Sequence, residues 1–162
     1  MRRNEMLRPL QVPVPPIAAW LGYGGLLPFV LLALGILVDD QRAALFSAAL
    51  IAYGAVILSF VGALHWGFAM SWGEFTAESG HRRRNEVFAW SIVPTLLAWA
   101  ALLVPVVLAS TLLIAGFIAH YGQDWRLAAV ASLPAWYLPM RLRLTVFACL
   151  CLGIGALAHV WR

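Results

Sequence analysis

The feature that most constrains this chain is a series of long apolar stretches separated by short polar ones. Apolar runs cover residues 17–38, 43–70, 87–104, 106–121 and 142–160. A helix needs about 20 apolar residues to cross the hydrocarbon core of a bilayer. Because every backbone polar group must be paired inside lipid, such segments cross it as α-helices. The sequence therefore predicts an all-α integral membrane protein, a five-helix transmembrane bundle.

The composition supports this interpretation. Of the 162 residues, 63% are hydrophobic and only 11% are charged, whereas about a quarter of an average soluble domain is charged. A surface this apolar favours lipid over water, so we expect one membrane domain over residues 1–162 with the lipid bilayer as its first partner. The net charge of +4 comes from arginines that flank the apolar runs, and we expect no nucleic-acid binding.

Residues 87–121 admit two interpretations, one long kinked helix or a hairpin of two spans that turns near Pro105. A single helix of this length would measure about 51 Å, too long for one bilayer. The hairpin also places nine of the eleven basic residues on one side: Arg2, Arg3, Arg8, Arg82, Arg83, Arg84, Arg126, Arg141 and Arg143. By the positive-inside rule that side is cytoplasmic. We therefore predict a bacterial inner-membrane protein with a cytoplasmic N-terminus, a basic, proline-rich cytoplasmic arm over residues 1–16 and a periplasmic C-terminus.

Proline and small residues predict local details. Pro28 should kink the first span, and Asp124–Leu133 should form a short interfacial helix after the fourth span ends at Tyr121. Pro134 and Pro139 should then prevent regular helix until about Leu142. Small residues recur along one face of the second span and predict a helix-packing seam: Ala48, Ala52, Ala55, Ser59, Gly62 and Ala69.

The residue most out of place is His65, near the cytoplasmic end of the second span. Ionisable residues inside a span are costly and usually face the bundle interior. His120 ends the fourth span at the same side, and Asp124 follows one helical turn later. We expect one polar and aromatic cluster at the inner leaflet: His65, Trp66, His120, Asp124, Trp136, Tyr137, Arg141 and Arg143. Arg82, Arg83 and Arg84 are assigned to topology and lipid headgroups.

Several chemistries could use such a cluster. A buried structural hydrogen-bond network is the simplest. A haem or metal bound by His65 and His120, a quinone site beside His65, and a proton relay from His65 to Asp124 are the alternatives. Cys149 and Cys151 point in different directions on a helix, so we predict neither a disulfide nor a metal pair between them. The sequence holds no familiar catalytic motif, and we expect no enzymatic activity, no catalytic residue and no resident metal or cofactor.

Four motifs resemble a family of small bacterial membrane proteins, domain of unknown function 3429, which has a mitochondrial animal relative called transmembrane protein 69. The motifs are PIAAWLGYGGLLPF, YGAVILSFVGALHWG, VPTLLAW and LPAWYLPMRLRLT, and the resemblance covers roughly residues 16–155. It implies a five-span helical domain with no established activity to transfer. Pro139 and Met140 stand where the family pattern leads us to expect a polar or basic pair. The resemblance falls on Gly22, Gly25, Pro28, Phe29, Tyr53, Ser59, His65, Trp66, Gly67, Pro94, Trp99, Asp124, Pro134, Trp136, Tyr137, Arg141, Arg143 and Thr145.

The functional expectation is a non-enzymatic accessory or scaffold subunit that packs against a larger membrane complex. Its small size, its small-residue seam and its tryptophans motivate this, and the mitochondrial relative suggests an energy-transducing host. The first alternative is a membrane protein that binds haem or quinone near His65. A proton or small-solute conduit is the second alternative.

Overall fold

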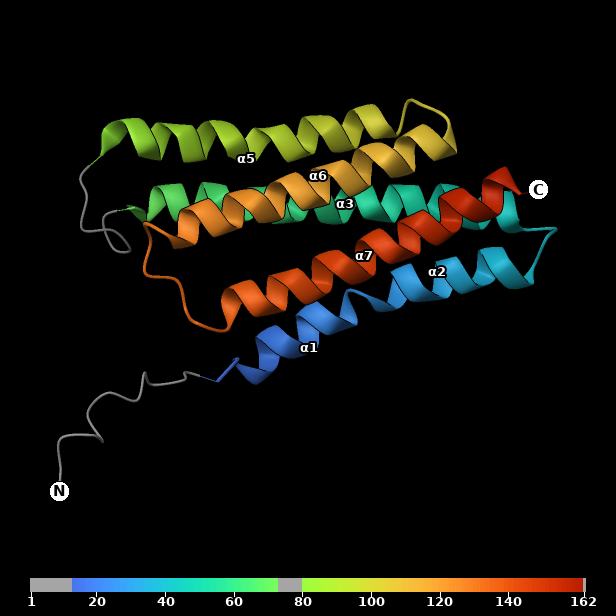
Figure 1. Cartoon of the computed structure of the whole chain (residues 1–162), viewed down its shortest axis with the longest axis horizontal. Coiled ribbons are helices and arrows are strands. Elements are labelled where there is room, and N and C mark those ends of the chain that lie inside the picture. The colour runs from blue at the N-terminus through green and yellow to red at the C-terminus, as the bar shows by residue number, and fades with distance from the viewer. Residues whose placement is uncertain (1–12, 73–79, 162) are drawn as a thin grey trace, which may run out of the picture.

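The computed structural model describes residues 13–72 and 80–161, and their regular secondary structure is all α-helix. Figure 1 shows long rods lying side by side. The described helices are α1 (Pro16–Gly24), α2 (Leu27–Val38), α3 (Ala43–Met70), α5 (His81–Ala101), α6 (Val106–Ala128) and α7 (Tyr137–Val160). With α1 and α2 as two halves of one broken span, this confirms the predicted five-helix bundle.

Four of these spans are long and apolar enough to cross a membrane: α1 with α2, α3, α6 and α7. The remaining helix, α5, begins at His81 rather than at Val87, and its first turns carry Arg82–Arg84 and Glu86. The polar start of α5 therefore belongs to the same helix as its apolar continuation. The protein is a multi-pass membrane protein.

The first span breaks just before Pro28. α1 ends at Gly24 and α2 begins at Leu27, which puts Pro28 in the first turn of α2, where its missing N–H leaves no hydrogen bond unmade. The break frees the carbonyl of Gly25 from helical pairing, and the hydroxyl of Tyr53 donates a hydrogen bond to it at 2.8 Å. The expected kink is thus a short break between α1 and α2, and a hydrogen bond from Tyr53 connects this break to α3.

The longest helix, α3, packs against α2, α5, α6 and α7. It approaches α5 closely at Gly62, where an added Cβ would lie 3.0 Å from Cβ of Pro94. The predicted seam is correct at Ala55, Gly62 and Ala69, which are buried, and wrong at Ala48 and Ala52, which are exposed. Both of these alanines lie in the first ten residues of α3, on a face of the helix that is exposed there.

α5 and α6 form the predicted hairpin and not one rod. α5 ends at Ala101, and Pro105 caps α6. α6 then continues to Ala128, so the predicted end at Tyr121 and the separate helix over Asp124–Leu133 are wrong. Asp124 is thus an interior residue of α6, and its carboxylate is bonded to two side chains of α7 that are described below.

α7 also begins earlier than predicted, at Tyr137. Pro139 lies in its first turn, where the backbone N–H groups have no helical acceptor, so proline is tolerated there. Starting from Tyr137 brings that residue and Arg141 onto one face of the helix, one turn apart.

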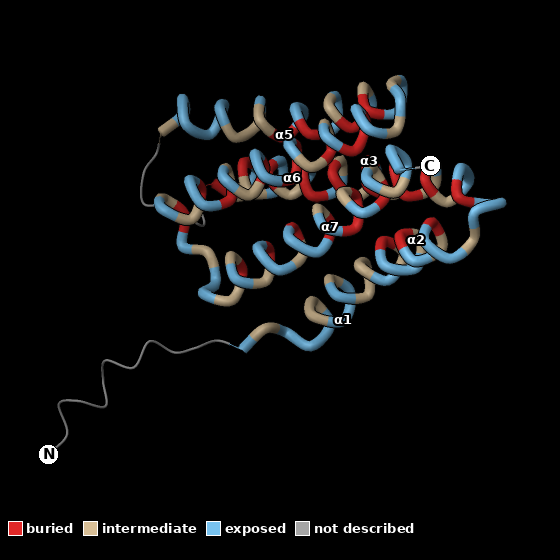
Figure 2. Tube along the Cα trace, turned by 45° about the vertical axis from the view of Figure 1, so that its right-hand side comes forward, coloured by how far each residue is buried: buried red, intermediate tan, exposed pale blue. Residues whose placement is uncertain are grey.

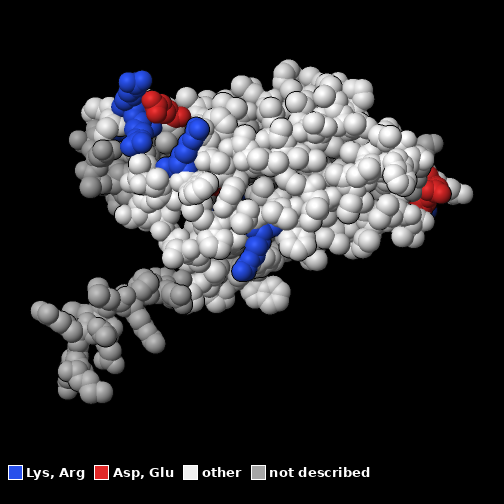
Figure 3. Space-filling model, viewed as in Figure 1, with Lys and Arg blue, Asp and Glu red and all other residues white. Residues whose placement is uncertain are grey.

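Positive charge collects where α5 begins, α6 ends and α7 begins. This arginine-rich end, as we call it, carries Arg82–Arg84, Arg126, Arg141 and Arg143. Figure 3 shows most of the visible basic side chains at one end of the molecule, a further one partway along the bundle, and acidic side chains at both ends. Figure 1 places the chain's C-terminal end at the opposite end of the bundle. Residues 1–12 of the predicted arm lie outside the described residues.

The core is apolar along most of the bundle. Buried side chains such as Leu58, Leu113 and Leu152 fill its centre. Figure 2 shows buried positions on the inward faces of α2, α3, α6 and α7, while α5 is buried only towards its end, and α1 contributes no buried residue. A smaller apolar group of Trp72, Leu127 and Ala131 covers the arginine-rich end.

Candidate functional site at the arginine-rich end

Asp124 is the centre of a buried polar group. Its side chain is fully buried in α6, and its two oxygens have different partners on α7. The hydroxyl of Tyr137 donates to Oδ1 at 3.1 Å, and Nε of Arg141 donates to Oδ2 at 2.8 Å. A buried carboxylate alone would be very costly, and this charge-assisted pair offsets much of that cost.

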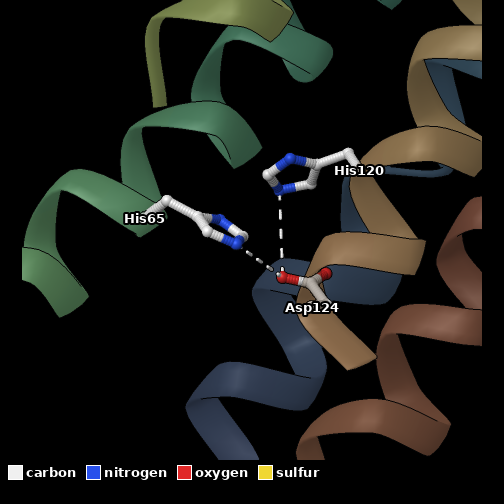
Figure 4. A group of neighbouring side chains, drawn as sticks. All are labelled: His65, His120 and Asp124. Carbon is white, nitrogen blue, oxygen red and sulfur yellow. Dashed lines mark ion pairs between the residues drawn. The ribbon is translucent and has the colours of Figure 1, made fainter. Parts of the chain in front are cut away.

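Two histidines face the same carboxylate oxygen. Nε2 of His65 lies 3.8 Å from Oδ1 of Asp124, and Nε2 of His120 lies 3.9 Å from it. Figure 4 shows both rings directed at the carboxylate, one from α3 and one from α6. Their ring centroids are 4.6 Å apart in an edge-to-face arrangement. Both separations from the carboxylate exceed hydrogen-bond length, so these contacts are electrostatic.

Trp90 fixes the proton on His120. Its indole N–H donates to Nδ1 of His120 at 3.2 Å. Because Nδ1 accepts, a neutral His120 carries its proton on Nε2, the atom that faces Asp124. Both ring nitrogens of His65 are buried without a hydrogen-bond partner, as are Nε2 of His120 and Nη2 of Arg141. Within this group, His65 is the histidine that has neither ring nitrogen in a hydrogen bond.

His65, His120 and Asp124 have the residue types of a metal site, with ligand atoms within 4.8 Å of one another. Two features favour a hydrogen-bond network instead. Nε2 of His120 presents an N–H and not a lone pair, and the guanidinium of Arg141 already neutralises Asp124. A bis-histidine haem does not fit either, because the two rings touch each other and leave no space for a porphyrin plane between them.

The predicted residues divide into those the structure brings together and those it does not. His65, His120, Asp124, Tyr137 and Arg141 meet in one buried group. Trp136 reaches it only through the ring of Tyr137, at a centroid distance of 6.3 Å.

The other predicted residues lie outside this group. Trp66 is 48% exposed and packs on Phe88, because it points away from the face that carries His65. Arg143 is exposed and donates to Tyr23. Arg82 pairs with Glu86 on the exposed start of α5.

The sequence pattern did not single out two residues that the structure places at this site. Trp90 lies three residues after Val87, less than one helical turn into the apolar part of α5, where a tryptophan is ordinary for a membrane span. Trp72 is buried beyond the end of α3, and nothing in the pattern marks it. Thr145, one of the residues on which the family resemblance falls, is buried one turn after Arg141.

A cavity of about 600 Å³ adjoins this group between the end of α3, the start of α5 and the end of α6. Figure 1 shows α5 and α6 diverging towards this end. His65, Trp72 and Leu127 form its buried wall. Its remaining lining residues are Arg83, Glu86, Val87, Ala89, Trp90, Val93, Gln123, Arg126, Ala129 and Val130.

The cavity grades from polar to apolar. Its exposed rim carries Arg83, Glu86 and Arg126, and its depth is aromatic and aliphatic. Its volume lies in the range of small-molecule sites, which are usually apolar with a few polar groups that orient the ligand. Chemically, the imidazole of His65 can form a hydrogen bond with a ligand in the cavity. Behind His65 lies the buried carboxylate of Asp124, whose charge is neutralised by Arg141.

Comparison with known proteins places the chain among its relatives. Transmembrane protein 69 of Xenopus tropicalis is 37% identical over 147 residues, which cover 90% of this chain. They cover 55% of the frog protein, so the chain spans little more than half of that relative's length. No solved structure matches the chain significantly. The family model described as protein of unknown function (DUF3429) matches residues 14–157, and the chain therefore belongs to the DUF3429 family.

Proposed function

We propose that this protein binds a small amphipathic ligand of the quinone class, with the ligand's ring in the cavity beside His65. The observation that carries this proposal is the coincidence of a ligand-sized cavity with a buried histidine that has no hydrogen-bond partner on either ring nitrogen. A buried polar group without a partner costs about 1–3 kcal/mol, and a ligand that supplies the missing hydrogen bond recovers part of it.

The lining supports this ligand class. A quinone carries carbonyl oxygens, which accept hydrogen bonds, on a flat ring that packs against aromatic walls. His65 supplies the imidazole, and Trp90 and Trp72 supply aromatic surface. Val93 lines the cavity and is 43% exposed on the apolar part of α5, so an apolar tail has a route towards lipid.

Matched histidine variants test the proposal. His65→Phe keeps a ring of similar size but removes the nitrogens, and His159→Phe makes the same change at the exposed, opposite end of α7. Binding of decylubiquinone to the purified full chain is measured by equilibrium dialysis. We expect His65→Phe to weaken binding about tenfold, equivalent to roughly 1.4 kcal/mol, and His159→Phe to leave it unchanged.

An organic extract of gently solubilised protein provides a second measurement. Quinone present in the wild-type extract and depleted in the His65→Phe extract supports the proposal. Equal quinone in both extracts, or equal affinity of the two variants, contradicts it.

An accessory role in a larger membrane complex is our second proposal. It is supported by α1, which lies at the edge of the bundle without burying any residue and exposes 79% of Trp20. A helix that leaves this much apolar surface exposed suits contact with another membrane subunit. Native gels of gently solubilised source membrane test it: co-migration with a larger complex supports the role, and a lone monomer argues against it.

A conduit across the membrane receives less support. Among the described residues, the buried acidic, basic and histidine side chains are His65, His120, Asp124 and Arg141, and all four lie towards the arginine-rich end. The other buried polar side chains are the hydroxyl groups of serine and threonine: Ser47, Ser91, Ser110 and Thr145. Unchanged proton flux into proteoliposomes on His65→Ala would argue further against a conduit.

A further inference from the structure

Arg143 is a charged residue on an apolar, outward-facing stripe. It is exposed in α7, and the residues three, four and seven positions later, Val146, Phe147 and Leu150, are each about half exposed. They share one helix face, which in a membrane faces lipid acyl chains. Arg143 lies about 9 Å along the helix from Tyr137, where α7 begins.

The contrast with Arg141 is informative. Arg141, two positions earlier, points inward and is neutralised by Asp124. Within residues 13–72 and 80–161, no carboxylate lies within ion-pair distance of Arg143, and its recorded hydrogen-bond partner is the neutral hydroxyl of Tyr23 at 3.3 Å. Arginine remains protonated in proteins, so a full positive charge faces the bilayer there.

Tyr23 completes a two-residue cradle. It comes from α1, which is held close to α7 because Gly22 leaves space for the Met140 side chain: an added Cβ at Gly22 would overlap Cε of Met140. The Tyr23 oxygen accepts from Nη1 of Arg143, so its own proton is available for donation. Exposed Trp20, one turn earlier on α1, has the character of a residue at the lipid headgroup level.

We propose that Arg143 and Tyr23 bind the phosphate of an anionic phospholipid on the outer surface where α1 lies beside α7. The guanidinium presents several N–H donors that match phosphate oxygens, and the tyrosine hydroxyl adds another donor. The apolar stripe of Val146, Phe147 and Leu150 accommodates an acyl chain of the same molecule. The positive charge without a described acidic partner favours a lipid with net negative charge. This site is on the outside of the bundle and is independent of the cavity beside His65.

The test uses the full chain purified in mild detergent, with retained lipid counted by native mass spectrometry during titration with dioleoyl phosphatidylglycerol. The wild type should retain one phosphatidylglycerol in preference to dioleoyl phosphatidylcholine. Arg143→Gln should weaken retention about fivefold, as expected for one arginine at a charged lipid surface. Tyr23→Phe should have a smaller effect, and Arg143→Lys should restore part of the affinity because it keeps the charge.

Arg42→Gln is the matched control, since Arg42 is exposed, is paired with Asp39 and has no assigned contact with lipid headgroups. It should retain lipid as the wild type does. Equal retention by Arg143→Gln and the wild type would overturn the proposal, as would equal losses in Arg143→Gln and Arg42→Gln. If inorganic phosphate displaces the lipid from the site at equal concentration, the site recognises free phosphate and the lipid assignment is wrong. Should Arg143→Gln fail to fold, Tyr23→Phe and Arg143→Lys carry the comparison.

Discussion

At the scale of single residues, the protein places its most costly side chain, Asp124, where three helices meet. The carboxylate is tolerated because Arg141 and Tyr137 reach it from α7, and neither histidine is close enough to replace them. The pair behaves as one energetic unit, since removing either member leaves the other buried without its partner.

Asp124→Asn should therefore destabilise the protein strongly, by about 3–5 kcal/mol, because it leaves the Arg141 guanidinium buried without its counter-charge. The double variant Asp124→Leu/Arg141→Met should cost much less than the sum of Asp124→Leu and Arg141→Met made singly. Unfolding of the detergent-solubilised protein, followed by circular dichroism, measures all four variants. Additive losses would show that the pair is not coupled.

Trp90→Phe should allow the proton of neutral His120 to move from Nε2 to Nδ1. Without the indole N–H, Nδ1 of His120 loses its donor and is free to carry the proton itself. Nitrogen-15 NMR of histidine-labelled protein should then show protonated Nδ1 on His120, with a stability loss of about 1 kcal/mol. Trp99→Phe, at a 62% exposed position of the same helix, is the control and should change neither quantity.

The sequence identified His65, His120 and Asp124 because polar residues inside apolar runs stand out by their cost. It placed Trp66 in the same group wrongly, since adjacent residues on a helix diverge by about 100° and only His65 points inward. Trp90 was missed because tryptophan is common in membrane spans. Only the distance between its indole and His120, which depends on how α5 packs on α6, gives it a role.

At the scale of helices, the boundaries depend on which polar groups find partners. α6 continues past Tyr121 because Asp124 is paired, and α2 begins at Leu27 because Pro28 suits a first turn. The existence and order of the helices follow from apolar length and were predictable. Their ends depend on contacts between helices distant in sequence, such as Tyr53 with Gly25, and so could not be predicted from the sequence.

Gly62→Val should destabilise the contact between α3 and α5. A Cβ at Gly62 would lie 3.0 Å from Cβ of Pro94 and 3.1 Å from the carbonyl oxygen of Ser91, so a larger side chain overpacks the crossing and should cost about 1–3 kcal/mol. Gly67→Val makes the same substitution on α3 where an added Cβ meets no atom within 4 Å. Thermal unfolding should separate the two variants, and equal melting temperatures would refute the close-packing argument.

At the scale of the whole molecule, the arginine-rich end is the basis for predicting the orientation in the membrane. The positive-inside rule predicts that this end is cytoplasmic, and the bundle places the turn between α2 and α3, with Asp39 and Asp40, at the opposite end. The rule concerns insertion into a membrane rather than the packing of the bundle, so orientation remains a prediction that labelling must test.

Single cysteines test the orientation in a background with Cys149 and Cys151 replaced by alanine. Asp40→Cys in intact bacterial cells should react with a membrane-impermeant maleimide, and Arg84→Cys should react only after the cells are opened. The opposite labelling pattern would reverse the assigned topology. Stability of the cysteine-free background, checked by gel filtration, is the control.

The uneven placement of the buried charges has an electrical consequence. Work done by a transmembrane voltage on a group scales with the fraction of the field that its charge crosses. Asp124 and Arg141 cancel one another near one end of the bundle, and no other charged side chain is buried among the described residues. We therefore expect protonation or ligand exchange at this group to displace little charge along the field, and its equilibrium to depend only weakly on the membrane potential.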